Sequence, residues 1–367
     1  MKITAIYLSQ QGGGAALDFL ELAMGLAKCS QTLCIVSSES ACYWRWLEAE
    51  KTINNLSVLG VKTTKNPIKG ILSFCDLIKF HKIRKAINAF SPDVIYSHAT
   101  HPWEKAIVPY LKCKTVFKAL HDINLHEGEN SLREKLQVSL FMYKPKYYVV
   151  YSEFSKKELC KRGINPEAIF TVSLGSCTLL SKTRTLDLKY YGRFLFFGRL
   201  IKYKGIDVLL KSLPEVVGAF PEVKLVLAGR GDITEYEDLI NQYKNNIEIH
   251  NEWILDEDVE KYFKDIDFVV APYINATQSG VVPLSYFFGK PVIISDNGGL
   301  PEQVVEGETG SVFKTGDSCQ LASLIMQYLS DKEELTRKKK VSYDYSDEVS
   351  WDATARKLYN HFTSIKK

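Results

Sequence analysis

Two cations that follow an apolar run make one short loop of this chain a candidate anion site. The run FLFFG ends at Gly198, and Arg199 and Lys204 then flank a loop that leads into a helical pattern. Where a buried strand gives way to a helix, backbone N–H groups and the positive end of the helix converge. A guanidinium and an ammonium group at that point could bind a pyrophosphate. A strand–helix turn with two solvated cations is the alternative. Other motifs in the chain are needed to distinguish this turn from a pyrophosphate site.

A second candidate site lies in Pro272–Gly310, where turn residues and hydrogen-bond donors are dense. Ala276–Gly280 follows an apolar strand pattern and opens a helical pattern, so its backbone amides could face phosphate oxygens. Gln278 and Ser279 add neutral donors there, and Gly298 ends the next strand pattern before another expected helix start. Two helix N-termini and one cationic loop aimed at one cleft favour ligand binding over packing alone.

Histidines follow two apolar strand patterns in the first half of the chain. His121 and Asp122 end one pattern with His126 just beyond, and His98 and His101 close another. Strand ends of this kind face the cleft in open α/β folds, so His121 could bond to a sugar hydroxyl or help to position an acceptor. Structural histidines are one alternative. A metal pair from His121 and His126 is another, but it lacks an evident third ligand.

Three glycines, Gly12 to Gly14, lie between the first strand pattern and the first helical pattern. Glycine has no Cβ, so backbone amides there can approach a ligand closely. The run is not G-x-G-x-x-G, and no acidic residue follows at the spacing of a dinucleotide-binding unit. Dinucleotide redox chemistry is therefore weakly supported, and a tight turn without a ligand is the alternative.

Apolar runs alternate with helical patterns from end to end, which predicts βαβ units and parallel sheets. The expected strands are residues 3–8, 33–36, 94–96, 115–119, 147–150, 194–197, 224–228, 247–250, 268–271 and 292–295. The expected helices include residues 15–27, 71–90, 132–142, 155–161 and 351–362.

The length of 367 residues predicts two domains. We expect α/β domains over 1–176 and 193–345, a polar linker over 177–192, and a C-terminal segment 346–367 whose aromatic helix could pack back on the first domain. Two open α/β domains in tandem leave a cleft between their strand ends, where ligands usually bind in such sheets.

Composition argues against several classes of protein. The net charge of +4 gives no support for a nucleic-acid binder. The N-terminus lacks the apolar core of a signal peptide, and no stretch approaches the ~18 apolar residues of a membrane span. Eight scattered cysteines without a C-x-x-C pair indicate buried thiols in a reducing cytosol, so we expect a cytoplasmic protein.

The expected helix 71–90 departs from the plain pattern because four basic residues accompany its apolar ones. Such a helix can lie on an anionic membrane surface. It can also pack on the core with a solvated basic face. The four cations are Lys79, Lys82, Arg84 and Lys85.

Together these motifs resemble glycosyltransferase family 4, a large retaining family with the GT-B fold, in which two Rossmann-like α/β domains face each other across a cleft. The motifs are G-R-L-x-x-x-K-G at 198–205, L-x-L-A-G-x-G at 225–231, G-K-P-V-I at 289–293, G-G-L-P-E at 298–302 and E-x-x-x-G at 306–310. They occur in this order, and the resemblance covers nearly the whole chain and is strongest in the second half.

The resemblance implies a hexosyltransferase that moves a sugar, with retention, from a nucleotide-diphosphate sugar to a glycan or lipid-linked acceptor. It also implies a role in surface polysaccharide biosynthesis, no metal and no cofactor, with possible peripheral contact to an anionic membrane. Residues 1–176 would lie on the acceptor side, and residues 193–345 would bind the nucleotide sugar.

Roles for single residues also follow from the resemblance. Arg199 and Lys204 would hold the donor diphosphate, and His121 would contact the donor sugar. Asp122 would join His121 in sugar positioning and in acceptor deprotonation. The other expected donor-site residues are Gly13, Gly14, Arg230, Trp253, Ile254, Gln278, Ser279 and Gly280, with His98 and His126 on the acceptor side.

The sequence departs from the family at one important place. Members usually carry two glutamates eight positions apart where this chain has Ala276 and Leu284. It resembles instead a subset with A-T-Q-S-G in this loop and H-D…H-x-G in the first domain, in which Gln278 could take over a sugar contact. A nucleotide-sugar epimerase of the same fold and a non-catalytic nucleotide-sugar-binding subunit are the alternatives.

Overall fold

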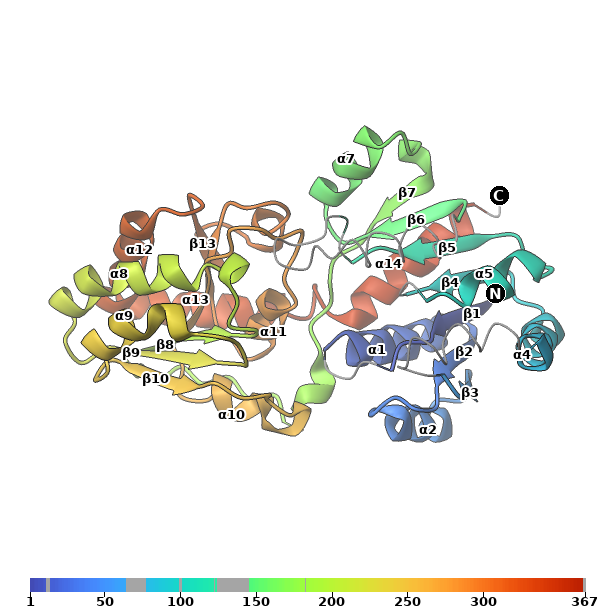
Figure 1. Cartoon of the computed structure of the whole chain (residues 1–367), viewed down its shortest axis with the longest axis horizontal. Helices are drawn as coiled ribbons and strands as arrows, with labels where there is room; N and C mark the ends of the chain where they lie inside the picture. The colour runs from blue at the N-terminus through green and yellow to red at the C-terminus, as the bar shows by residue number, and fades with distance from the viewer. Residues whose placement is uncertain are drawn as a thin grey trace. The chain divides into compact units, whose positions relative to one another are not determined.

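A computed structural model of the chain describes residues 1–10, 14–63, 77–98, 101–121, 123, 145–181 and 183–365. They form two compact units, Met1–Val172 with Trp351–Lys367, and Ser173–Ser350. The first unit is blue to green in Figure 1, with the final red helix, and the second is green to red. The expected helix 132–142 and residues 71–76 lie outside the described residues.

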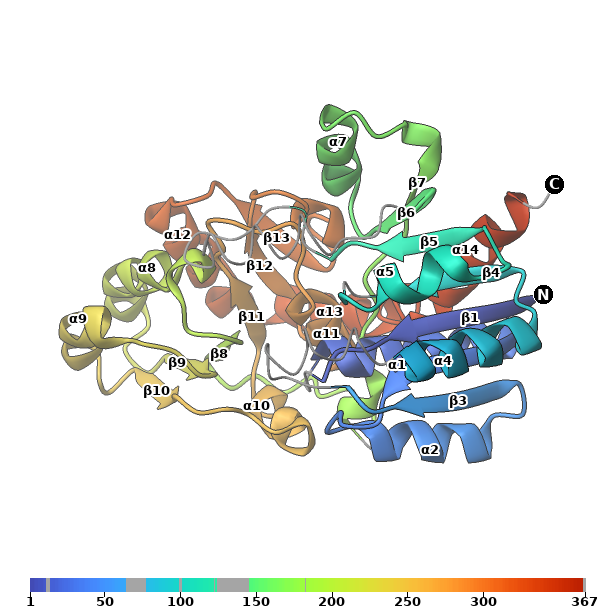
Figure 2. The same cartoon turned by 45° about the vertical axis from the view of Figure 1, so that its right-hand side comes forward.

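The first unit is built on a parallel sheet whose described strands have the order β3-β2-β1-β4-β5-β6-β7 (Figures 1 and 2). Because β1 neighbours both β2 and β4, the winding direction changes between β1 and β4, where ligands bind in open α/β sheets. The strands are β1 Lys2–Tyr7, β2 Gln31–Ser37, β3 Leu56–Val61, β4 Val94–Ser97, β5 Val116–Ala119, β6 Tyr147–Val150 and β7 Ile169–Thr171.

Helices cover both faces of this sheet. On one face, residues of α4 and α5 share a hydrophobic cluster with strand residues, among them Ile6, Phe80 and Trp103. On the other face α14 packs against α1, and Trp351 Nε1 donates a hydrogen bond to Asp18 Oδ1 at 3.0 Å. The helices are α1 Gly14–Cys29, α2 Tyr43–Thr52, α4 Leu77–Phe90, α5 Glu104–Ile107, α7 Glu153–Lys161 and α14 Trp351–Ser364, with 3-10 turns η2 Val108–Tyr110 and η3 Pro166–Ala168.

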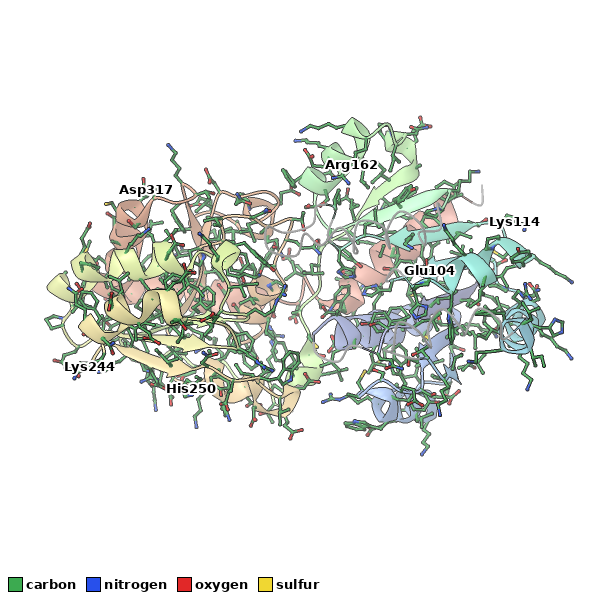
Figure 3. The ribbon with its side chains drawn as sticks, viewed as in Figure 1. Glu104, Lys114, Arg162, Lys244, His250 and Asp317 are labelled. Atoms are coloured by element: carbon green, nitrogen blue, oxygen red, sulfur yellow. The ribbon has the colours of Figure 1, made fainter. Side chains whose placement is uncertain are left out.

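A buried ion pair fixes the carboxyl ends of β4 and β5. Lys118 Nζ lies 2.6 Å from Glu104 Oε2, and the two side chains are only 1% and 2% exposed. Ser97 donates to the other carboxylate oxygen of Glu104 at 2.7 Å. Figure 3 labels Glu104 in the interior of this unit. Removing one partner would leave an uncompensated buried charge, so the pair holds α5 against the two strand ends.

The second unit repeats the same architecture. Its described strands have the parallel order β10-β9-β8-β11-β12-β13, with the winding change between β8 and β11. The strands are β8 Arg193–Phe197, β9 Lys224–Ala228, β10 Ile247–His250, β11 Phe268–Ala271, β12 Val292–Ser295 and β13 Gly310–Phe313. The helices are α8 Ile206–Ala219, α9 Glu237–Gln242, α10 Val259–Phe263, α11 Val281–Phe287, α12 Ser318–Ser330 and α13 Lys332–Tyr345. The 3-10 turns are η4 Thr178–Leu180, η5 Lys202–Lys204, η6 Thr234–Tyr236, η7 Asp256–Asp258 and η8 Pro301–Gln303.

The prediction of two parallel α/β sheets is confirmed. The residues expected to form a linker, 177–192, belong to the second unit, and the final helix belongs to the first. Within the described part of the chain, no helix is both long enough and apolar enough to cross a bilayer.

Candidate functional site

The cationic loop, residues 198–205, joins β8 to α8 at the carboxyl edge of the second sheet. The Gly198 N–H donates to the Ala228 carbonyl and the Leu200 N–H to the Arg230 carbonyl, both at 2.9 Å. Parallel pairing therefore continues past the ends of β8 and β9. This pairing sets the path of the backbone that carries the two cations.

Two glycines allow this loop to pack closely. Gly205 has φ +71°, and a Cβ there would lie 1.8 Å from the Pro272 carbonyl oxygen. A Cβ on Gly231 would lie 1.8 Å from the Leu200 carbonyl oxygen. Only glycine fits such approaches, so the loops after β8, β9 and β11 are held together by backbone contact.

Arg199 and Lys204 each contact a tyrosine side chain. Lys204 is half-buried, and its Nζ lies 3.7 Å from the centroid of the Tyr273 ring. The Lys204 ammonium group makes no hydrogen bond or ion pair with a described residue, whereas Arg199 Nη2 donates to Tyr203 Oη at 2.7 Å. Cation–π contact orients an ammonium group and leaves its N–H donors unused. Because α8 begins at Ile206, the positive end of a helix lies beside the two cations.

The loop after β11 differs from expectation in how its amides are used. The Ala276 N–H donates to Asn297 Oδ1 at 2.8 Å, and the Ser279 N–H donates to Gln303 Oε1 at 2.7 Å. Gln303 Nε2 returns a hydrogen bond to the Ser279 carbonyl at 3.0 Å. These two amides therefore do not face a ligand, contrary to what the sequence led us to expect. Asn297 and Gln303, which the sequence reasoning missed, hold the loop instead.

Two side chains of the same loop differ in whether their polar atoms have hydrogen-bond partners. Ser279 is buried, and its hydroxyl donates to Tyr273 Oη at 3.2 Å and accepts from the Val281 N–H at 3.3 Å. Gln278 is half-buried, and its Oε1 atom is buried without a hydrogen-bond partner. An unmade hydrogen bond on a buried oxygen costs free energy, so a ligand donor would be favoured there. Gly280 is exposed at the start of α11.

The remaining expected donor-site residues follow β9 and β10 on the same edge of the second sheet. Arg230 is exposed, Trp253 is 62% exposed and Ile254 is half-buried. Asn251 orders this region because its Oδ1 accepts from the Gly231 N–H at 2.9 Å. The sheet thus brings these residues to the edge that carries the cationic loop. Contact of Trp253 with a nucleotide base stays a prediction.

The first unit contains a histidine cluster, Tyr96, His98, His121 and Tyr151, at the carboxyl ends of β4, β5 and β6. His98 Nε2 lies 3.0 Å from His121 Nε2, and His98 Nδ1 lies 3.0 Å from Tyr96 Oη and 3.5 Å from Tyr151 Oη. His98 is fully buried. A fully buried ring presents no surface to an acceptor, so direct contact does not support the acceptor-side role that we expected for His98. Among the described residues, its Nε2 atom contacts His121.

Burial also changes the charge states near this cluster. It lowers the pKa of His98 well below the usual value, with the neighbouring His121 adding to the effect. It lowers the pKa of His101 to about 4. It raises the pKa of the Asp18 carboxyl to about 8, partly offset by the hydrogen bond from Trp351. His98 and His101 are therefore neutral at neutral pH, and Asp18 holds a proton.

Several expected residues are not tested by this geometry. Gly12, Gly13, Asp122 and His126 lie outside the described residues. Gly14 begins α1 directly after them and is exposed, and nothing lies within 4 Å of a Cβ built there. No cluster of three or more His, Cys, Asp or Glu residues suited to a metal ion occurs in the described ranges.

Comparison with known proteins finds a family match within the second unit. Residues 192–331 match the family model described as glycosyl transferases group 1. An uncharacterized glycosyltransferase of Methanocaldococcus jannaschii is 28% identical over 215 residues, covering 56% of this chain and 53% of the relative. A D-inositol 3-phosphate glycosyltransferase of Corynebacterium diphtheriae is 28% identical over 171 residues, covering 44% and 40%. The chain thus spans about half the length of these relatives.

Solved structures establish the fold of the whole chain. The crystal structure of HepE from Anabaena in complex with UDP superimposes with a TM-score of 0.73 at 18% identity, and covers 99% of this chain and 100% of HepE. The expected GT-B fold is confirmed by this likeness.

Proposed function

We propose that this chain, whose residues 192–331 match the family model described as glycosyl transferases group 1, transfers a sugar from a nucleotide-diphosphate sugar to an acceptor with retention. The observation that carries the proposal is the cationic loop, where Lys204 and Arg199 are oriented by tyrosines beside the start of α8. HepE has been solved with UDP and with UDP-glucose, which supports a donor of that class.

The loop suits the charge that develops during glycosyl transfer. As the bond between the anomeric carbon and the diphosphate oxygen lengthens, negative charge builds on the leaving diphosphate. Fixed cations and a helix N-terminus stabilise that charge more than they stabilise the ground state. Retention by attack from the leaving-group face needs no protein nucleophile, so none is assigned. In this proposal the second unit holds the nucleotide sugar and the first receives the acceptor.

A donor panel tests the proposal. The protein is incubated with nucleotide sugars and candidate acceptors, and released nucleoside diphosphate is followed. Arg199→Ala and Lys204→Ala should each lower kcat roughly 100- to 1000-fold, the usual loss for one charge-stabilising group. Lys202→Ala is the matched control, because Lys202 is an exposed cation of the same loop. Near-normal turnover in the Arg199 and Lys204 variants would contradict the diphosphate assignment.

The same panel separates the alternatives. A nucleotide-sugar epimerase would release a new nucleotide sugar without an acceptor. A binding subunit would bind nucleotide in an Arg199-dependent way and consume no donor.

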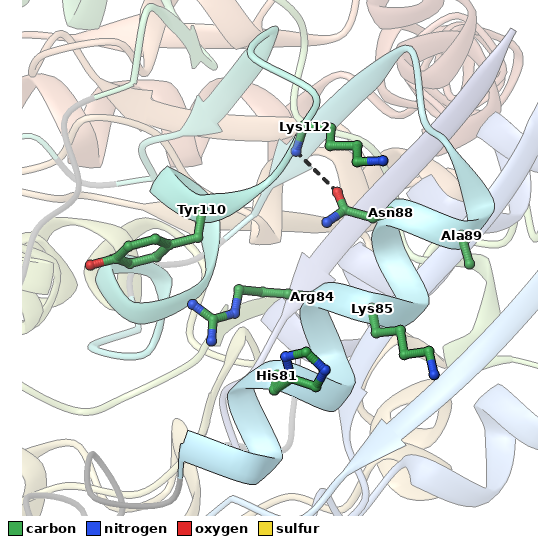
Figure 4. A pocket seen from close by; sticks show the side chains of 7 residues that line it. All are labelled: His81, Arg84, Lys85, Asn88, Ala89, Tyr110 and Lys112. Atoms are coloured by element: carbon green, nitrogen blue, oxygen red, sulfur yellow. Dashed lines mark hydrogen bonds between the residues drawn. The ribbon is translucent and has the colours of Figure 1, made fainter.

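A lipid-linked acceptor is supported by the outer face of α4. Its inner side chains Phe80, Ile83 and Ile87 are buried, while Leu77 and Ile78 are 69% and 71% exposed. Beside them lies an open hollow of ≈ 630 Å³, and no acidic side chain lines it among the described residues (Figure 4). Its lining residues are His81, Arg84, Lys85, Asn88, Ala89, Tyr110 and Lys112. Exposed apolar groups next to cations suit an anionic membrane surface.

Liposome flotation tests this part of the proposal. The variant Lys82→Gln/Arg84→Gln/Lys85→Gln should lose flotation with vesicles containing anionic lipid and keep its activity on a soluble acceptor. Lys211→Gln/Lys244→Gln/Lys264→Gln is the control, with equal loss of charge at exposed lysines of the second unit. Unchanged flotation of the first variant would refute membrane contact through α4.

A further inference from the structure

The open hollow beside α4 presents hydrogen-bond donors from two segments of the first unit. Arg84, Lys85 and Asn88 belong to α4, whereas Tyr110 and Lys112 belong to η2 and the residues after it. Figure 4 shows the two segments joined where the Lys112 backbone N–H donates to Asn88 Oδ1 at 3.0 Å. Both segments therefore build one site, which is more than the surface of a single helix.

Arg84 is held by contacts that leave the end of its guanidinium group available. Its Nε donates to the Phe80 carbonyl at 3.2 Å, one turn earlier in α4. Its Cζ lies 5.0 Å from the centroid of the Tyr110 ring, close enough for a cation–π contact. Its Nη1 and Nη2 atoms make no hydrogen bond or ion pair with a described residue. Planar donors fixed in this way match two oxygens of a phosphate group.

The other two permanent cations of the hollow also lack acidic partners. Lys85 and Lys112 are exposed, and neither ammonium group makes an ion pair or hydrogen bond within the described part of the chain. No acidic residue is among those that line the hollow in the described ranges. Positive charges gathered without a negative one favour an anion that carries more than a single charge.

Carbonyl oxygens near the hollow are occupied, although α4 ends there. The Phe90 carbonyl, at the end of α4, accepts from Lys2 Nζ at 3.3 Å. Lys114 Nζ donates to the carbonyls of Pro109 and Leu111 at 3.2 and 2.8 Å. Exposed carbonyls at the end of a helix repel an anion. The two lysines reduce that repulsion here.

We propose that the hollow beside α4 binds a dianionic phosphate group, with Arg84 as its bidentate ligand and Lys85 and Lys112 balancing its charge. A phosphomonoester carries about −1.5 to −2 charges at neutral pH and has three acceptor oxygens. A phosphodiester has a single charge and two such oxygens, so the hollow should prefer the monoester. The phosphate belongs either to a lipid headgroup or to a soluble molecule. This inference goes beyond the membrane contact proposed above, which needs positive charge and exposed apolar groups but no defined ligand.

Vesicles of matched surface potential test for a lipid headgroup. One set contains phosphatidylcholine with phosphatidic acid, and the other contains the amount of phosphatidylglycerol that gives the same zeta potential. Phosphatidic acid exposes a phosphomonoester and phosphatidylglycerol a phosphodiester. If the ligand is a headgroup, the full chain should bind phosphatidic acid about tenfold more tightly, the gain from one charge-assisted hydrogen bond.

Arg84→Lys separates a defined site from general electrostatic attraction. It keeps the positive charge but loses the planar donors and the stacking on Tyr110, so the preference for phosphatidic acid should disappear while binding to phosphatidylglycerol remains. Lys82→Gln is the control, because Lys82 is an exposed cation of α4 that does not line the hollow. It should weaken binding to both vesicle types equally. A preference that survives in Arg84→Lys, or disappears in Lys82→Gln, would refute the site.

Inorganic phosphate tests for a soluble ligand. Phosphorus-31 NMR is recorded in the Arg199→Ala/Lys204→Ala background, so that the cationic loop of the second unit does not contribute. Line broadening of inorganic phosphate but not of dimethyl phosphate, abolished by Arg84→Lys, would support the site. Such binding without a preference among vesicles assigns the site to a soluble phosphate, and a vesicle preference alone assigns it to a headgroup. Absence of Arg84-dependent binding in both experiments would overturn the inference.

The proposals fail in different ways. Loss of flotation on every vesicle, with Arg84-dependent binding of inorganic phosphate retained, would refute membrane contact and leave the phosphate site standing. Flotation without any preference for a phosphomonoester, in vesicles or in solution, would refute the phosphate site alone. Absence of sugar transfer would refute the proposed function and affect neither result.

Discussion

At the scale of single residues, the candidate donor site depends on side chains that the motifs do not contain. Arg199 and Lys204 could be predicted from spacing, because a strand–loop–helix junction is a local property of the sequence. Gln303 and Asn297 could not, because their hydrogen bonds to the loop after β11 join residues more than twenty positions apart. A local motif thus predicts candidate ligand-binding side chains more readily than it predicts the side chains that hold the binding loops in place.

Gln278 and Gln303 should respond differently to replacement by alanine. Gln278→Ala removes a buried oxygen without a partner, so stability should change little while KM for the donor rises. Gln303→Ala breaks two hydrogen bonds to Ser279 and should lower the free energy of unfolding by ~1–3 kcal/mol. Urea denaturation and donor titration of both variants measure this contrast. Equal loss of stability in the two would contradict it.

Gly205 should tolerate no side chain. In Gly205→Ala the Cβ would overlap the Pro272 carbonyl oxygen at a φ of +71°, so we expect a loss of ~1–3 kcal/mol and weaker donor binding as the loop shifts. Gly218→Ala in α8 is the control, because nothing lies within 4 Å of its Cβ. Alanine there should add up to ~1 kcal/mol. Thermal unfolding distinguishes the two, and a neutral Gly205→Ala would disprove the close approach.

At the scale of elements, strands were predicted well where they are short, apolar and buried on both faces. β9, β11 and β12 begin and end at the expected residues, because parallel strands buried on both faces read as continuous apolar runs. β3 was missed because it is partly exposed and contains Ser57 and Gly60. α2 was missed because only Trp46 and Ala49 of its ten residues are buried, which leaves little periodicity.

The pairing of α1 with α14 should make the stability of the first unit depend on pH. The pKa of Asp18 is raised to about 8 from its ordinary 3.8, so the native state binds more protons than the unfolded state between these values. The free energy of unfolding should therefore fall as pH rises from about 4 to about 8 and then level off. In Asp18→Asn this contribution should vanish, which denaturation at several pH values can measure. A variant that keeps the wild-type slope would rule out Asp18 as its source.

At the scale of the whole molecule, two units of similar winding carry different candidate residues. Each carries its candidate residues at the carboxyl edge of its sheet and beside the change in strand order, as open α/β sheets do in general. The alternation of strand and helix patterns in the sequence was sufficient to predict two parallel sheets with candidate residues at their carboxyl edges. The assignment of the last helix to the first unit rests on contacts such as that between Trp351 and Asp18, which no local pattern reveals.

Deletion of residues 351–367 should therefore damage one unit selectively. Without α14, the rings of Tyr96 and Phe117 lose their contacts with Phe362, so the first unit should lose protection against amide hydrogen exchange. The second unit, Ser173–Ser350, should keep its protection. Mass spectrometry of peptides from both units provides the measurement. Equal loss in both, or in neither, would argue against this division.

The return of α14 to α1 has a consequence for biosynthesis. Residues of the second unit emerge from the ribosome before Trp351, so that unit can complete its fold while the first still lacks a helix that covers its sheet. The amino-terminal half must then keep its aromatic surface uncovered until α14 has been translated. Ribosome-bound chains halted before α14 should accordingly recruit chaperones to the amino-terminal half.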